Sequence, residues 1–228
     1  MSSSPLKVSP PNHDDLLFDD IVHHFNGIAK TPLHSNAFQL SPDQKIAKIA
    51  AHFSEILHTL GMDLTDESIK DTPLRVAKMY VNETFKGLIP ENEPLITQFA
   101  NDYRYSQMLV EKNITVFSTC EHHLVPIHGK AHVAYFSTGK VVGLSKLNRL
   151  VDYYSRRPQV QERLTIQVAD AIKKALNTND VAVVIDAHHM CVASRGIRDV
   201  NSSTVTAEYS GKFLNPEIRK EFLEFIRG

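Results

Sequence analysis

The segment that decides the expected fold is Ile114-Thr-Val-Phe-Ser-Thr-Cys120, followed shortly by His128-Gly-Lys-Ala-His-Val-Ala-Tyr-Phe-Ser137. The first stretch is rich in β-branched and aromatic residues, and it is typical of a strand that ends at Cys120. The second alternates apolar and polar residues, as a strand with one buried face does. Thr138-Gly139 separates it from Val141-Val142, and this spacing predicts a hairpin.

Further strand and helix signals follow along the chain. Ser145 is expected to cap a helix, Pro158 interrupts it, and a second helix is expected from about Gln159 to Leu176. Two more strands are expected at 181–187 and 203–209, and Asn215-Pro216 begins a terminal helix. Strands and hairpins around a pair of helices predict an α+β fold with an antiparallel sheet.

Helical signals also precede these strands. Ser41-Pro-Asp-Gln44 predicts a capping box, and apolar residues then recur at helical spacing until Gly61. A second helix is expected from Asp71-Thr-Pro73 to Gly87. We therefore expect a variable, mobile tail at 1–40, a helical region at 41–110 and a domain at 111–228 that holds the chemistry.

Charge and hydropathy exclude several classes of protein. The chain has 228 residues, with 25 Lys and Arg against 26 Asp and Glu and a net charge of −1, so a general nucleic-acid-binding surface is not expected. Apolar stretches such as 181–185 are far shorter than the ~20 residues that cross a bilayer. The first residues lack the apolar segment of a secretory signal. We expect a cytoplasmic protein that binds neither nucleic acid nor membrane.

Two clusters of cysteine and histidine carry the strongest chemical signal. Cys120-Glu-His-His123 and His188-His189-Met-Cys191 each follow an expected strand. Zinc accepts cysteine sulfur and histidine nitrogen, so Cys120, His123 and Cys191 could form a three-ligand site of the catalytic kind. The alternative is a pair of buried free cysteines with incidental histidines, and either cluster alone would favour it.

The remaining histidines of these clusters suggest acid–base chemistry. With three ligands assigned, His122 and His189 are left beside the metal as proton-transfer groups. Zinc acidifies its water, so a hydrolytic site is the resulting hypothesis.

A third group of residues predicts an anion-binding site. Ser145 at a helix start would expose backbone N–H groups, and Lys146 and Arg149 share one helix face. The alternative is that these residues form a solvated cationic helix face without a ligand. The residues alone favour the anion site and this alternative equally. Arg195 adds a cation close to Cys191.

Gln161 and Glu162 stand at the start of the next helix. Glu162 could accept two hydrogen bonds from a guanidine-like edge, and Gln161 could add an amide contact. An acidic residue is also favourable at any helix start, and the physics of the sequence alone prefers that explanation for Glu162.

Four of these strings together resemble the GTP cyclohydrolase I family. They are Ser118-Thr-Cys-Glu-His-His-Leu-Val-Pro, Val142-Gly-Leu-Ser-Lys-Leu-Asn-Arg, Arg157-Pro-Gln-Val-Gln-Glu-Arg-Leu-Thr and His189-Met-Cys-Val-Ala-Ser-Arg-Gly. Asp71-Thr-Pro-Leu-Arg-Val-Ala-Lys adds a fifth, and the resemblance runs from about Ser41 to the C-terminus. Residues 1–40 lie outside it.

The resemblance implies a fold and a reaction. The fold is the tunnelling fold, an antiparallel sheet with two helices on one face, preceded by an N-terminal helical region. Family members are toroidal homodecamers with active sites between subunits. The reaction converts GTP and water to 7,8-dihydroneopterin triphosphate and formate, the first step toward folate or tetrahydrobiopterin.

The resemblance also implies a role for each site residue. Cys120, His123 and Cys191 match the zinc ligands, and His122 and His189 match the proton-transferring histidines. Glu162, with Gln161 beside it, matches the guanine-recognising acid of the family, and Arg75 matches a phosphate-contacting arginine. The positions that match triphosphate- and substrate-binding residues are Ser145, Lys146, Arg149 and Arg195. Arg75 would come from a neighbouring subunit. His188 departs from the family pattern; because neighbours on a strand face opposite ways, we do not expect it to be a ligand.

Two other functions fit part of the pattern. One is a zinc-stabilised module that binds nucleotide without turning it over. The other is a different tunnelling-fold enzyme, such as a nitrile reductase with a cysteine nucleophile and NADPH. Formate release from GTP and metal analysis distinguish these functions.

Overall fold

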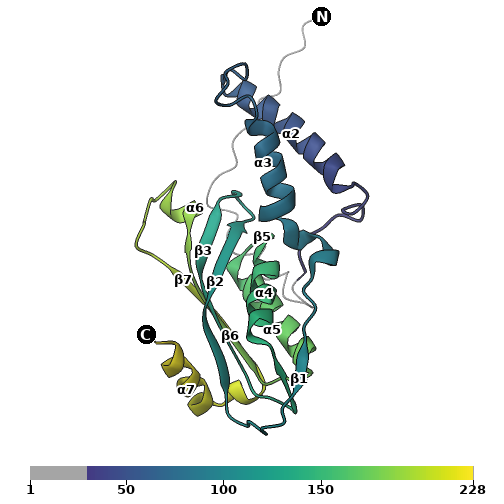
Figure 1. Cartoon of the computed structure of the whole chain (residues 1–228). Coiled ribbons are helices and arrows are strands. Elements are labelled where there is room, and N and C mark those ends of the chain that lie inside the picture. The colour runs from purple at the N-terminus through teal and green to yellow at the C-terminus, as the bar shows by residue number, and fades with distance from the viewer. Residues whose placement is uncertain (1–29, 228) are drawn as a thin grey trace, which may run out of the picture. The chain divides into compact units, whose positions relative to one another are not determined.

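A five-stranded sheet forms the centre of the computed structural model, which describes residues 30–227 (Figure 1). Its strand order is β5-β2-β3-β6-β7, and every neighbouring pair is antiparallel except β2 with β5. The strands are β2 (Leu109–Cys120), β3 (Pro126–Tyr135), β5 (Pro158–Gln159), β6 (Val181–His189) and β7 (Thr204–Tyr209). The predicted α+β class with a mainly antiparallel sheet is confirmed.

Helices cover both faces of this sheet. Helices α4 (Leu144–Ser155) and α5 (Gln161–Leu176) pack on one face, and the C-terminal helix α7 (Pro216–Ile226) packs on the other (Figure 1). Strand alternation explains the two-sided packing: Val183 contacts the α4–α5 layer, whereas its neighbours Ala182 and Val184 contact the α7 layer. The two helices expected on one face are present, and α7 adds a third layer.

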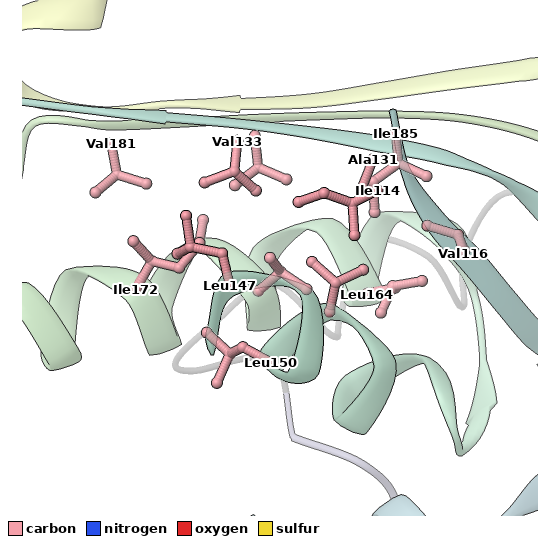
Figure 2. Packing of buried hydrophobic residues seen from close by; sticks show 14 of the residues in the cluster. Ile114, Val116, Ala131, Val133, Leu147, Leu150, Leu164, Ile172, Val181 and Ile185 are labelled. Carbon is pink, nitrogen blue, oxygen red and sulfur yellow. The ribbon is translucent and has the colours of Figure 1, made fainter. Parts of the chain in front are cut away.

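The larger core lies between the sheet and helices α4 and α5. Figure 2 shows Val133, Val181 and Ile185 pointing from the strands toward Leu147, Leu164 and Ile172 of the helices. Each of these side chains is at most 1% exposed. Burying a side chain of this size contributes about 1.5–3 kcal/mol, so this layer fixes where the ends of the strands lie relative to the helices.

The other described elements are shorter or lie outside the sheet. They are α2 (Pro42–Thr59), α3 (Thr72–Met79), the π-helical turn η1 (Tyr80–Thr84), the 3₁₀ turns η2 (Lys86–Leu88), η3 (Pro90–Asn92) and η4 (Gly211–Leu214), strands β1 (Gln98–Ala100) and β4 (Lys140–Val142), and α6 (Met190–Ala193).

Helix α2 begins as the sequence predicts. The Ser41 hydroxyl accepts from the Gln44 backbone N–H at 3.3 Å, and the Gln44 side chain accepts from the Ser41 N–H at 2.9 Å. Gly61, with φ of 81°, follows its end. The apolar face of α2 is only partly covered, because Leu60 is 71% exposed and Ile56 49% exposed.

The second predicted helix does not continue unchanged to Gly87. Helix α3 ends at Met79, the chain widens into the π-helical turn η1, and it then tightens into η2. Gly87 lies where two backbones meet: its N–H donates to Arg156 O at 3.0 Å. A Cβ at this position would lie 2.0 Å from Tyr153 O, so the close approach needs glycine.

The predicted hairpin between 128–137 and Val141-Val142 is wrong. Strand β4 pairs with β1, with Val142 opposite Gln98. Strand β3 already has β2 on one edge and β6 on the other, so it has no free edge for residues 141–142. The Val142 N–H instead donates to the Tyr135 hydroxyl at 3.2 Å.

The predicted tail lies largely outside the described residues, which begin at Lys30. Within the described part, Thr31 Oγ1 accepts from Arg157 Nη1 at 3.2 Å, so contacts with the rest of the chain begin before residue 40. The domain boundaries remain a prediction. Among the described residues, every helix is too short or too polar to span a bilayer.

Candidate metal centre and active site

Three predicted ligands converge at one end of the sheet. Cys120 is the last residue of β2, His123 lies in the following turn, and Cys191 lies in α6 directly after β6. Strands β2 and β6 are both antiparallel to β3, so they run in the same direction and end at the same edge. One donor atom from each residue lies within 4.8 Å of the others.

A tight turn carries His123 back toward Cys120. The Leu124 N–H donates to Cys120 O at 2.9 Å, and the Cys120 N–H donates to Val125 O at 2.9 Å. Leu124 has φ of 52°, a left-handed conformation that costs a residue with a Cβ about 1–2 kcal/mol. Backbone strain of this kind is concentrated at functional sites, and here it permits the turn to close.

The three donors form a set that could hold a metal ion. Cys120 is buried, Cys191 is half-buried and His123 is exposed, so the group opens to solvent on the histidine side. Burial and the neighbouring Cys120 thiol raise the pKa of Cys191. Two thiols this close resist losing both protons, and a divalent cation between them would offset that cost. Neither cysteine is in a disulfide.

Two polar side chains border this set of donors. His122 Nδ1 lies 3.6 Å from Cys120 Sγ, and Arg195 Nη1 lies 3.1 Å from His123 Nε2. The predicted grouping of His122 and Arg195 with the cysteines is therefore present within one chain.

His189 is held by the first residue of α5. Its Nε2 lies 2.7 Å from Gln161 Oε1, and Gln161 itself is only 2% exposed. Burial lowers the pKa of His189, while the nearby Glu162 carboxylate acts in the opposite direction. Glu162 is exposed in the first turn of α5.

An ion pair that the sequence analysis did not identify joins the ligand turn to α5. Arg163 donates to Glu121 through both Nη atoms, at 2.5 and 3.1 Å, and both side chains are mostly buried. The Glu121 N–H also donates to Gln159 O at 3.0 Å. Glu121 lies inside the Cys-Glu-His-His string, and Arg163 directly follows Glu162. Their positions next to these two motifs are the sequence feature that could have pointed to the ion pair.

The predicted anion site lies apart from these residues within a single chain. Helix α4 buries Leu147 and Leu150 against the sheet, which leaves Ser145 and Arg149 exposed and Lys146 half-buried. Across residues 30–227, no hydrogen bond or ion pair joins any of these three to the cysteine–histidine group.

Ser145 is not the N-cap of α4, as the sequence had suggested. Gly143 occupies that position with an extended backbone, and Ser145 is the second residue of the helix. The Lys146 N–H donates to Gly143 O at 2.8 Å, so the helix begins without a side-chain cap.

Arg75 and His188 also lie outside the metal group. Arg75 is exposed on α3 and pairs with Asp71 at 3.5 Å. His188 stacks on His128 of the neighbouring strand, with 5.5 Å between ring centroids, and its Nδ1 contacts Ser202 O at 3.1 Å. His188 therefore faces the opposite side of β6 from His189, as strand alternation predicts.

Comparison with known proteins agrees with this geometry. The family model described as GTP cyclohydrolase I matches residues 49–227. GTP cyclohydrolase 1 of Flavobacterium johnsoniae is 58% identical over 216 residues, which cover 95% of this chain and 97% of that protein. GTP cyclohydrolase 1 of Vibrio parahaemolyticus is 51% identical over 199 residues, which cover 87% and 91%.

Among solved structures, an archaeosine synthase QueF-Like in the apo form shares 18% identity with a TM-score of 0.40, covering 47% of this chain and 97% of that one. That similarity is too weak to define the fold. The match to the family model and the identity along nearly the whole length are decisive: the chain belongs to the GTP cyclohydrolase I family.

Proposed function

We propose that this GTP cyclohydrolase performs its reaction at the Cys120–His123–Cys191 group with Zn²⁺ bound there. The reaction converts GTP and water to 7,8-dihydroneopterin triphosphate and formate, the first step of the folate pathway. The observation that carries the assignment is the convergence of two thiols and an imidazole within 4.8 Å. Family membership decides for the enzyme over a nucleotide-binding module or a nitrile reductase.

The donor set fits zinc better than it fits other common ions. Catalytic zinc sites use three protein ligands and keep one position for water, and thiolate with imidazole is a zinc-type set. Tetrahedral bonds of about 2.0–2.3 Å place ligand atoms roughly 3.3–3.8 Å apart, so the present donors need only a small closure. When bound, the ion would supply a Lewis acid that makes water a nucleophile near pH 7.

The chain's own residues would handle protons and orientation. His122, beside Cys120, and His189, beside Gln161, would move protons to and from the purine ring. Glu162 would accept hydrogen bonds from the N–H edge of guanine, because a carboxylate offers two acceptor oxygens to two parallel donors. Arg195, close to His123, would bring a positive charge to the substrate beside the metal group.

The triphosphate end would be held by residues of a neighbouring subunit. Lys146 and Arg149, with Ser145 beside them, lie on the solvent side of α4, and Arg75 lies exposed on α3, paired with Asp71 at 3.5 Å. A second copy of the chain would bring such a cationic face to the Cys120–His123–Cys191 group. Partly uncovered apolar residues on α2 favour the same assembly.

The proposed architecture is the tunnelling fold assembled as a homodecamer. The mainly antiparallel sheet with α4 and α5 on one face is what that fold requires of one subunit. Family membership supports the toroidal decamer with active sites between subunits.

Formate release from GTP, measured together with zinc content, tests the proposed function. We expect one zinc per chain and formate release that disappears when Cys191→Ala removes a ligand. The exposed cation Lys220 lies on α7, far along the chain from every site residue, and Lys220→Ala is the matched control that should change neither quantity. Full turnover by zinc-free Cys191→Ala would contradict the assignment.

A further inference from the structure

Gln161 occupies a closed network of hydrogen bonds inside the protein. Its side-chain nitrogen lies 3.0 Å from Ile185 O, 2.8 Å from Thr204 O and 3.1 Å from Thr206 Oγ1. Its side-chain oxygen lies 2.7 Å from His189 Nε2. With an exposure of 2%, the amide has little surface left for a substrate.

The partners of the amide decide its orientation. Ile185 O and Thr204 O are backbone carbonyls that only accept, so the atom facing them has to be the NH₂ group. The alternative orientation would bring three oxygens against the amide oxygen. The amide oxygen is therefore the atom that faces His189.

The two threonines of the network agree with this orientation. The Thr165 hydroxyl donates to the backbone carbonyl oxygen of Gln161 at 2.9 Å, so the single hydroxyl proton of Thr165 is already used. Thr206 Oγ1, 2.6 Å from Thr165 Oγ1, then has to be the donor in that contact. Its oxygen remains free to accept from the Gln161 side-chain NH₂ group, whose two protons are shared among Ile185 O, Thr204 O and Thr206 Oγ1.

An amide oxygen can only accept, and this fixes which nitrogen of His189 carries hydrogen. Nε2 has to donate to Gln161 Oε1, so in the neutral imidazole Nδ1 carries the lone pair. A histidine held in one tautomer offers one defined nitrogen for proton transfer, and a free histidine divides its population between two.

We propose that Gln161 is a positioning residue for His189: it holds the Nε2–H tautomer and leaves Nδ1 as the atom that exchanges a proton with the substrate. This replaces the direct guanine contact that the sequence had suggested for Gln161, and it rests on the proposed function of the site. Recognition of the guanine edge then falls to the neighbouring Glu162.

The direct test is the tautomer of His189 in the wild-type holoenzyme. Solid-state ¹⁵N spectra of histidine-labelled protein separate protonated from unprotonated ring nitrogens, and the His189 signals are those missing from His189→Gln. We expect a protonated Nε2 and an unprotonated Nδ1. The opposite tautomer, or an equal mixture, overturns the proposal. Since no variant of Gln161 is needed, a folding defect cannot obscure this result.

The kinetic test separates positioning from substrate binding. Gln161→Met retains size and removes the polar contacts, so kcat should fall by roughly 10- to 100-fold as part of the ~10²–10⁴-fold that proton transfer contributes. KM for GTP and zinc content should stay within about threefold of wild type, as expected when only a transition-state interaction is lost. A large rise in KM with unchanged kcat would assign Gln161 to guanine and overturn the proposal.

A matched control completes the design. Gln159 is 0% exposed and lies two positions away, but its side-chain amide bonds to Tyr154 O and to Gln167 Oε1. Gln159→Met should therefore cost stability with kcat within about threefold of wild type. A loss of kcat in Gln159→Met as large as that in Gln161→Met would contradict the proposal.

Failure of the proposed function would look different. A wild-type holoenzyme that releases no formate from GTP would refute the reaction, and its ¹⁵N spectrum would still report the tautomer of His189.

Discussion

Arg163 and Glu121 form a bidentate ion pair, with both Nη atoms of the arginine bonded to the two carboxylate oxygens at 2.5 and 3.1 Å. The two side chains are 16% and 23% exposed. One belongs to the first turn of α5, beside Glu162, and the other to the turn between Cys120 and His123. The pair therefore joins the helix that holds the expected guanine-binding residue to the turn between two of the proposed metal ligands.

Arg163→Lys should loosen this junction, because lysine retains the charge but cannot form the two-pronged contact. We expect a loss of about 1.5–3 kcal/mol in the free energy of unfolding and a lower kcat. Chemical unfolding monitored by circular dichroism and steady-state turnover measure the two effects. Lys220→Met removes an exposed ion pair on α7 and serves as the control, expected to stay within about 0.5 kcal/mol. Equal free energies of unfolding for Arg163→Lys and Lys220→Met would show that the Arg163–Glu121 pair does not stabilise the fold.

His122 and His123 should behave differently although they are adjacent. His123→Ala removes a ligand and should lose both zinc and turnover. His122→Ala keeps Cys120, His123 and Cys191, so it should retain stoichiometric zinc while turnover falls by about 10²–10⁴-fold. Zinc content and formate release measured in parallel decide the matter. Loss of zinc from His122→Ala with retention in His123→Ala would reverse the two roles.

Lys146→Ala should weaken binding of GTP far more than binding of guanosine. In the proposed site Lys146 contacts the phosphate end of GTP, and a charge-assisted contact contributes about 1.5–3 kcal/mol, so KM for GTP should rise roughly ten- to hundredfold. Steady-state kinetics with GTP and competition by guanosine give the two values. An equal effect on both ligands would mean that Lys146 supports the structure of α4 instead.

His132 predicts a dependence of stability on pH. It lies in β3, 7% exposed, with the Asn113 N–H directed at its Nδ1 at 3.4 Å. Burial lowers its pKa, the cations Lys130 and Lys112 act in the same direction, and Asp186 opposes them. The unfolded chain therefore takes up this proton first as the pH falls, and stability is lost from about pH 6.5 downward through the folded-state pKa.

The measurement for His132 is the difference between wild type and His132→Gln. At fixed protein concentration, the melting temperature of the wild type should fall more steeply between pH 7.5 and pH 5.5 than that of the variant. Parallel curves would show that the other histidines account for the entire dependence.

Strand and helix positions could be predicted where one pattern repeats over several residues. Strand β6 and helix α5 follow from their apolar spacing, and the Ser41 capping box is local enough to be recognised in four residues. The partner of Val142 could not be predicted in this way, since it depends on which strand edges remain free after β2 and β6 have paired with β3.

The residues of the metal group could be named from side-chain chemistry, but their supports could not. Gln161 meets Thr204, 43 positions away, and Glu121 meets Arg163, 42 positions away. Neither contact has a spacing that a periodic pattern would reveal. The contact of Glu121 with Arg163 depends on how β5 places the start of α5 beside the end of β2, a parallel pairing of only two residues.

Because two backbones meet closely at Gly87, a movement of the chain at Gly87 would tilt helix α4. On one side lies the chain that leaves α3, and on the other lie Tyr153 and Arg156, with no side chain between the two backbones to absorb a movement. About 10 Å of helix separates Tyr153 from Lys146 near the opposite end. A tilt of about 6° at Gly87 would therefore shift Lys146 by about 1 Å, a displacement that can cost a reaction ~10²-fold in rate. Since Lys146 is proposed to hold the triphosphate of GTP, we expect substitutions beside Gly87 to slow the enzyme without any contact with its substrate.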